Sequence, residues 1–379
     1  FRYMTVEVEG MVSQTQISMM TSRKVQIAVA VGVLTVLLLL FNNLAPANTS
    51  GCSVALAPRS DKYVWGMTEL LPSGQYTIGI VSDLDKRSAV PGKKPKWRSW
   101  FRTAILRPIN GEGSSWQVEW KETKELVTGI GEKGRGMELS ELATYNKKLL
   151  AFDDRTGLVY EITQDGKAVP RHILTEGNGV TNKGQKTEWA TVKDGLLYVG
   201  SFGKEYTSPD GKEVQNTNNM WIKTIDANGR IDHIDWTKQY NALRASTNSV
   251  FPGYMILEAI EWDWINKRWV VLPRRVSSEP YDEVKDEKRA SNKVIFASAD
   301  FKDIEVKEVG KLTPERGFSS FKFLPGTKNK VVIALKSEEN DAEGTQSAYI
   351  CVLNLETGEY LMPETEIDGG FKYEGLEIL

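Results

Sequence analysis

A hairpin unit that recurs along the chain is the feature that most restricts the fold. Each copy opens with Glu or Ser, runs through a short apolar segment, makes a polar turn and resumes as a second apolar segment. Four copies occupy residues 140–155, 188–205, 258–275 and 319–339, and a fifth, at 373–379, stops after one segment. The turns NKK, KDG, NKR and GTKNK have the composition of hairpin connections. The pattern predicts an all-β fold.

The spacing of these copies predicts a five-bladed β-propeller. The leading positions 140, 188, 258, 319 and 374 are 48, 70, 61 and 55 residues apart, which leaves room for further strands in each unit. Units of this length are typical of propeller blades. We expect the early segment Tyr76 to Asp85 to supply the strand that the fifth copy lacks, because pairing the two ends of the domain removes exposed edges. The alternative is a generic all-β sandwich with similar hairpins.

An apolar run near the N-terminus predicts a membrane anchor. Val25 to Phe41 reads VQIAVAVGVLTVLLLLF, and seventeen residues are the short end of a membrane span. Arg23 and Lys24 precede it, so the positive-inside rule places the N-terminus in the cytosol. We expect a cytosolic tail over 1–24, a short transmembrane signal-anchor helix over 25–41, a stalk over 42–70 and the propeller over 71–379. A cleaved signal peptide is the alternative.

Composition argues against two classes of function. The formal net charge is only -2, so the chain lacks the basic excess of a nucleic-acid binder. It has two His and two Cys, without the spacing of a zinc site, which argues against a zinc hydrolase. The Asn48-Thr49-Ser50 sequon lies on the predicted lumenal side, so we expect a glycoprotein.

The leading residues of the repeats predict a metal site. In a propeller the first strand of each blade lines a central tunnel, so equivalent positions converge there. Several carboxylates brought together repel one another unless a cation compensates them. A set of oxygen ligands without His or Cys suits a hard divalent ion, and a large, flexible set favours Ca²⁺ over Mg²⁺. The predicted ligands are Ser140, Glu141, Glu188, Glu258, Ser319 and Glu374.

Glu141 differs from the other predicted ligands in its position on the strand. Glu141 adjoins Ser140, and neighbours on a strand point to opposite faces. Both can therefore reach one ion only if the backbone bends there or a water intervenes. The alternative for the whole set is that each residue is solvated separately at the end of its blade.

Charged residues in phase with the repeat predict the catalytic groups. They include Asp85 at the end of the early segment, Asp154 and Arg274 at the ends of second segments, and Arg135 between two glycines. Arginine offers a bidentate fork to phosphate, and a carboxylate can orient or deprotonate water. Cations and carboxylates around a bound metal suit the hydrolysis of a phosphoanhydride.

Longer motifs around these residues resemble a known family. EKGRGMELSEL, DDRTG, LYVG with GKE, YNALRA, GYMILE, LPRR, GFSSFKF, IALKSEE and KYEG are similar to the calcium-activated nucleotidases, which include salivary apyrases of blood-feeding arthropods. The resemblance runs from about residue 64 to 379. It implies a five-bladed propeller that hydrolyses nucleoside di- and triphosphates of the UDP, GDP and ADP type to monophosphates, with Ca²⁺ in the tunnel. The family's calcium positions fall on the six residues that the spacing selects.

The candidate catalytic residues suggest a mechanism, and the resemblance suggests a location. Water would attack the terminal phosphate directly, with Arg135 and Arg274 holding phosphate and Asp85 or Asp154 positioning the water.

Membrane-anchored vertebrate relatives imply a type II membrane protein of the endoplasmic reticulum or Golgi with a lumenal catalytic domain, a secreted form being left open. The alternative function is a non-catalytic, lumenal calcium-binding propeller that acts as an interaction module. The sequence leaves the preferred nucleotide and the oligomeric state open, a homodimer included.

Overall fold

The computed structural model describes residues 74–109 and 113–379. The predicted tail, anchor helix, stalk and glycosylation site fall at positions 1–70, outside the described residues. No helix in the described part is both long enough and apolar enough to cross a membrane. The chain divides into two units, 1–60 and 61–379, and the account below concerns the second.

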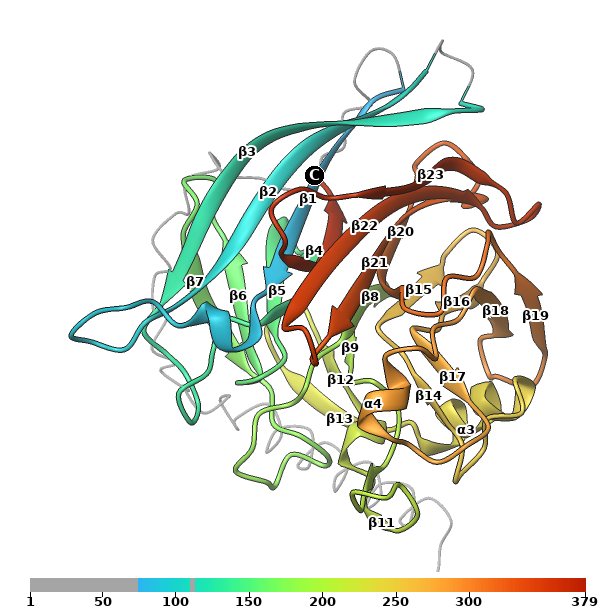
Figure 1. Cartoon of the computed structure of the whole chain (residues 1–379), viewed down its shortest axis with the longest axis horizontal. Helices are drawn as coiled ribbons and strands as arrows, with labels where there is room; N and C mark the ends of the chain where they lie inside the picture. The colour runs from blue at the N-terminus through green and yellow to red at the C-terminus, as the bar shows by residue number, and fades with distance from the viewer. Residues whose placement is uncertain (1–73, 110–112) are drawn as a thin grey trace, which may run out of the picture. The chain divides into compact units, whose positions relative to one another are not determined.

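The described residues form five four-stranded antiparallel sheets, here called blades A to E in the order A, B, C, D, E along the ring (Figure 1). Blade A holds β24 (Lys372–Ile378), β1 (Tyr76–Asp83), β2 (Trp97–Pro108) and β3 (Trp116–Thr128). Blade B holds β4 (Leu139–Tyr145), β5 (Lys148–Asp153), β6 (Leu158–Ile162) and β7 (Ala168–Ile173). Blade C holds β8 (Trp189–Lys193), β9 (Leu196–Gly200), β12 (Trp221–Ile225) and β13 (Ile231–Asp235).

The remaining blades follow the same order from the tunnel outward. Blade D holds β15 (Ala259–Asp263), β16 (Arg268–Leu272), β18 (Lys293–Ser298) and β19 (Ile304–Glu308). Blade E holds β20 (Gly317–Phe323), β21 (Val331–Asn340), β22 (Thr345–Asn354) and β23 (Tyr360–Glu366). Short elements join the blades: η2 (Asp85–Ser88), β10 (Tyr206–Thr207), β11 (Val214–Asn216), η3 (Asn218–Met220), α3 (Thr237–Ser246), β14 (Tyr254–Ile256), β17 (Arg275–Ser277) and α4 (Glu283–Asp286).

The first strands of the blades close a ring. β24 contacts β4, β4 contacts β8, β8 contacts β15, β15 contacts β20, and β20 returns to β24. The prediction of a five-bladed propeller is therefore confirmed, and the sandwich alternative is excluded. Each predicted two-strand unit is the inner pair of one blade.

The ends of the domain close the ring by sharing blade A. β1 pairs with β24, with Ile78 opposite Ile378 and Ile80 opposite Leu376. This confirms the expectation that the early segment completes the fifth unit. The pairing removes two free strand edges, each of which would otherwise expose unpaired backbone groups.

Apolar side chains fill the spaces between neighbouring blades. Between blades C and D, the ring of Trp269 lies 5.0 Å from that of Trp236 and 6.4 Å from that of Trp189. Buried aromatic pairs at such separations contribute about 0.5–1.5 kcal/mol beyond the area that they bury. These three tryptophans thus help to hold the inner strands of blades C and D in place.

Candidate active site

The leading residues of the five repeats lie where the inner strands begin. We call Ser140, Glu188, Glu258, Ser319 and Glu374 the mouth ring. Ser140 and Ser319 are the extra residues of β-bulges, since the pairing register shifts between Leu139 and Glu141 and between Phe318 and Ser320. Glu374 lies at a similar shift opposite β1. A bulge re-aims a side chain that regular pairing would turn away.

Direct contacts join members of the mouth ring from different blades. The Ser140 hydroxyl donates to Glu374 over 3.5 Å. Nη1 of Arg274 donates to Glu374 over 2.7 Å and also to Glu258, so both carboxylates lie within reach of one nitrogen. Lys186 binds Glu188 at 2.7 Å and also contacts Asp154.

The mouth ring fits a hard divalent cation. All five side chains are buried, and the Ser319 hydroxyl has no hydrogen-bond partner although it is fully buried. Burial raises the pKa of Glu258 to about 7, although Arg274 opposes the shift. Burial likewise raises the pKa of Glu188 well above its usual value, and the charges of Glu258 and Asp154 add to the effect. Buried carboxylates that repel one another, with a free hydroxyl among them, form the kind of oxygen set that binds such an ion.

Glu141 has partners different from those of the mouth ring. Its carboxylate accepts hydrogen bonds from Ser320 at 3.0 and 3.1 Å and lies 3.7 Å from the Lys322 ammonium. Both partners belong to β20, which is separated from β4 by β24 in the ring. The side chain therefore reaches across the tunnel, which the bulge at Ser140 permits. Its role as a metal ligand stays a prediction.

The mouth ring opens into a cavity of about 840 Å³. Eleven acidic and eight basic side chains line it, so the cavity carries an excess of negative charge that a divalent cation would offset. All four predicted catalytic residues line this cavity, together with three carboxylates of the mouth ring: Asp85, Arg135, Asp154, Arg274, Glu188, Glu258 and Glu374. Residues that are distant in sequence thus meet at one site, as expected.

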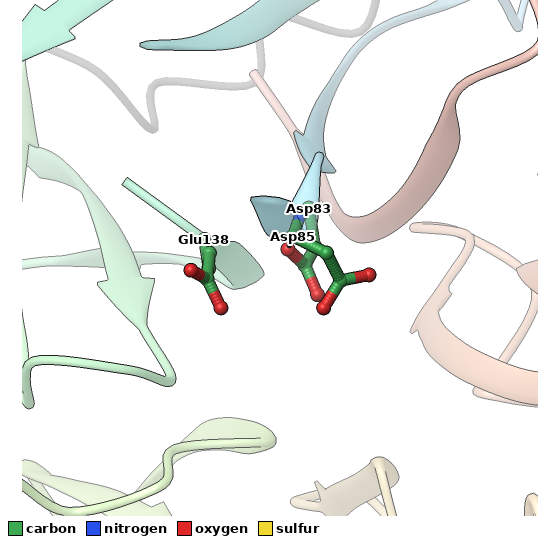
Figure 2. Close-up of side chains that lie close together, drawn as sticks. All are labelled: Asp83, Asp85 and Glu138. Atoms are coloured by element: carbon green, nitrogen blue, oxygen red, sulfur yellow. Dashed lines mark hydrogen bonds between the residues drawn. The ribbon is translucent and has the colours of Figure 1, made fainter. Parts of the chain in front are cut away.

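A second acidic cluster lies beside the mouth ring, where β1 ends and β4 is about to begin. Figure 2 shows Asp83, Asp85 and Glu138, each of which offers one oxygen within 4.8 Å of the others. Arg135 holds this cluster together, since its Nε donates to Glu138 over 2.8 Å and its Nη2 to Asp85 over 2.9 Å. The predicted phosphate-binding arginine is therefore already paired with two carboxylates.

These neighbouring carboxylates differ in their affinity for protons. Burial alone would raise the pKa of Asp85, but Lys372 and Arg135 outweigh it and lower that pKa below its usual value. Burial raises the pKa of Glu138 to about 7, against its hydrogen bond to Arg135. Asp85 is accordingly ionised at neutral pH, whereas Glu138 is partly protonated. Such differences within one site are typical of acid–base chemistry.

Two lysines that are not among the residues predicted from the sequence link the clusters. Lys372 binds Glu339 at 2.7 Å, Asp83 at 2.8 Å and Asp85 at 3.1 Å. Lys186 joins Glu188 to Asp154. Each lysine stands two residues before a mouth-ring glutamate, a regularity that would have identified both.

The fold and the site define a class: a closed five-bladed propeller with a carboxylate-rich tunnel mouth and a cationic wall. Residues 84–379 match the apyrase family model, and the chain belongs to the apyrase family. Soluble calcium-activated nucleotidase 1 of Rattus norvegicus is 43% identical over 322 residues, 84% of this chain and 78% of that protein. The apyrase of Cimex lectularius is 41% identical over 310 residues, 80% of this chain and 83% of that protein. The predicted family resemblance is confirmed.

Proposed function

We propose that this protein hydrolyses the terminal phosphoanhydride bond of nucleoside di- and triphosphates, of the UDP, GDP and ADP type, with Ca²⁺ bound at the mouth ring. The carrying observation is that three buried mouth-ring carboxylates, from blades A, C and D, meet paired cations in one cavity that residues of all five blades line. Membership of the apyrase family supports a nucleotide-hydrolysing enzyme. The rat relative is named a calcium-activated nucleotidase, which supports calcium as the ion.

The residues that would hold Ca²⁺ are Ser140, Glu188, Glu258, Ser319 and Glu374, with Glu141 as the sixth predicted ligand. Bound there, calcium would neutralise phosphate oxygens and polarise the bond to phosphorus. The orphaned Ser319 hydroxyl and the crowded carboxylates supply the reason for binding at this place. Oxygen ligands without nitrogen or sulfur suit calcium, which tolerates flexible geometry.

Cations of the cavity wall would bind the substrate's phosphates. Arg274 presents its guanidinium from blade D, and Lys372 presents its ammonium from blade A. Both are buried and already oriented by carboxylates. Preorganised donors of this kind stabilise developing charge on a transferring phosphoryl group without reorganisation during the reaction. Arg135, held at the rim by Glu138 and Asp85, would add a further contact.

Asp154 is better placed than Asp85 to position the attacking water. Both Asp85 oxygens are engaged, one by Arg135 and the other by Lys372 and Gln346. Asp154 instead has one oxygen on Lys186 and one buried oxygen without a partner. Water held there would attack phosphorus, form the new P–O bond and pass its proton to Asp154. The anhydride P–O bond would break, and its electron pair would leave with the nucleotide product.

Phosphate release tests the proposal against the non-catalytic alternative. Purified protein is assayed with UDP, GDP, ADP and ATP, with calcium and with a chelator. We expect release that requires calcium, and Asp154→Asn to lower turnover by at least about 100-fold while calcium binding stays within threefold of the parent. Absence of release from every nucleotide under both conditions would instead favour a calcium-binding interaction module.

We also propose that the chain is a glycosylated type II membrane protein of the endoplasmic reticulum or Golgi with a lumenal catalytic domain. The supporting observations are the apolar run at 25–41, the basic pair before it and the sequon after it. Protease protection of the propeller in microsomes, with a glycosidase-sensitive mass, is the expected result. Release into the medium without the apolar run would indicate a secreted form, and sedimentation of the same material would decide between monomer and homodimer.

A further inference from the structure

A second set of polar side chains lies behind the mouth ring, and the proposed mechanism uses none of them except Glu141. Thr191, Glu261, Lys322 and Glu377 each stand three residues beyond a mouth-ring residue. Glu141 supplies the corresponding group from blade B. We call these five residues the inner ring, and each blade contributes one of them.

Lys322 lies at the centre of the contacts within the inner ring. Its ammonium binds Glu261 and lies 3.7 Å from Glu141. Thr191 donates a hydrogen bond to the second oxygen of Glu261. Contacts from β20 therefore reach β15 on one side and, past β24, β4 on the other.

Gly375 makes the longer of these reaches possible. A Cβ atom at this position would lie 2.7 Å from the backbone of Glu141. Without that atom, β24 approaches β4 closely and leaves room for Glu141 to extend towards Lys322 and Ser320. The contact between Glu141 and Lys322 therefore depends on the absence of a side chain at Gly375.

Lys322 carries the single positive charge of the inner ring, whose three carboxylates it partly neutralises. Glu141, Glu261 and Glu377 are three carboxylates, and Lys322 is the cation that interacts with all three. Lys322 and its two closest partners, Glu141 and Glu261, are all buried. Removing the cation from such a group leaves negative charge in a poorly solvated place, which then requires protons or another cation.

We propose that Lys322 is the built-in counter-ion of the tunnel: its ammonium takes the place that a second cation would otherwise fill and fixes Glu141, so that the tunnel binds a single divalent ion. The single ion of the parent protein is the calcium ion of the proposed function, on which this inference rests. Lys322 is thus a positioning residue: it holds the inner ring in place and limits the number of ions that bind.

The test counts bound calcium by isothermal titration of the full chain. The parent protein and Lys322→Arg are expected to bind one ion, with affinities within threefold of each other. Lys322→Met is expected to bind two ions, because the carboxylates of the inner ring lose the ammonium that neutralises them. Methionine has a side chain of similar length, so the packing is preserved. Calcium should also raise the melting temperature of Lys322→Met by more than that of the parent.

Each outcome decides a different question. If the parent binds no calcium, the proposed function fails. If the parent and Lys322→Met both bind one ion with affinities within threefold, the proposed role of Lys322 is overturned. Should Lys322→Met not fold, Lys322→Met/Glu261→Gln removes a carboxylate with the lysine. It is expected to bind a second ion at least fivefold more weakly than the first, and a stoichiometry of one would also overturn the proposal.

Discussion

Arg274 and Glu374 are 100 residues apart in the sequence and belong to different blades, yet Nη1 of the arginine donates to Oε1 of the glutamate over 2.7 Å. The same guanidinium also binds Glu258 and Glu339. Carboxylates from blades A, D and E therefore share one cation. This contact links the closure of the ring directly to the geometry of the candidate site.

Replacing Arg274 separates its structural role from its role towards substrate. Arg274→Met leaves buried Glu258 and Glu374 without their shared cation, so we expect the free energy of unfolding without calcium to fall by about 3–5 kcal/mol. Calcium should restore much of the lost unfolding free energy, because the two carboxylates can then bind the metal ion without competition from the guanidinium. Turnover should stay low with calcium, since the phosphate contact is gone. Denaturant unfolding with and without calcium measures the first effect.

Arg98→Met is the matched control for this variant. Arg98 and Glu125 form an exposed pair, so its loss should cost less than about 1 kcal/mol and leave turnover unchanged. Equal losses of stability in the two variants would contradict the importance of the shared guanidinium.

Glu374→Gln tests the mouth ring at the residue with the most partners. Glu374 contacts Ser140, Arg274, Ser337 and Lys372. The glutamine amide has the size of the carboxylate but lacks the negative charge that binds the two cationic side chains and a metal ion. We expect calcium affinity to fall by about 100-fold or more, beyond the effect of typical outer-shell changes. Titration calorimetry measures it. Glu356→Gln, at an exposed pair with Lys330, should change nothing, and an unaltered affinity in Glu374→Gln would remove this residue from the site.

Calcium binding should depend on pH around neutrality. Burial raises the pKa of Glu258 to about 7, so this carboxyl carries a proton below that pH and must release it to bind a cation. Affinity should therefore fall as pH drops below about 7, by up to about tenfold per unit for each proton released. Calorimetry at pH 6 in two buffers of different ionisation enthalpy should detect about one proton or more released per ion, since the raised pKa of Glu188 adds to that of Glu258. Glu138→Gln should keep this release, whereas an affinity that is constant from pH 6 to 8 would contradict the assignment.

The same shift has a consequence for stability without metal. The folded-state pKa of Glu258 lies above its usual value of 4.5. The unfolded chain therefore loses this proton first, and the contribution of Glu258 to folding is lost as pH rises from about 4.5 through 7. Melting temperatures measured in chelator should show a decline over this range that Glu258→Gln reduces. A decline of equal size in the variant would assign the effect to other groups.

Gly375→Ala should damage both fold and site. The added Cβ atom would lie 2.7 Å from the Glu141 backbone, so β24 and β4 must separate. Overpacking of this kind costs about 1–3 kcal/mol of unfolding free energy. Gly129 has open space around its Cβ direction, and Gly129→Ala is the matched control with little expected change. Chemical denaturation compares the two, and equal stabilities would show that the close approach is not needed.

Much of the fold was predictable because it depends on local pattern. The short apolar segments and polar turns of each repeat mark the two inner strands of a blade, where most side chains are buried. The outer strands were not recognised individually. β7, for example, is half-exposed over most of its length, so its sequence carries little alternation.

The sequence by itself determined the number of blades, the closing role of the early strand and the residues of the mouth ring. These follow from repeat phase, because equivalent positions in a closed ring must converge. Only the tertiary structure decided the partners: that Lys186 and Lys372 join the clusters, that Arg135 is held by Glu138 and Asp85, and that Glu141 turns to Lys322. Those contacts depend on bulges that re-aim side chains and on ring closure between residues far apart in sequence, and neither leaves a periodic trace in the chain.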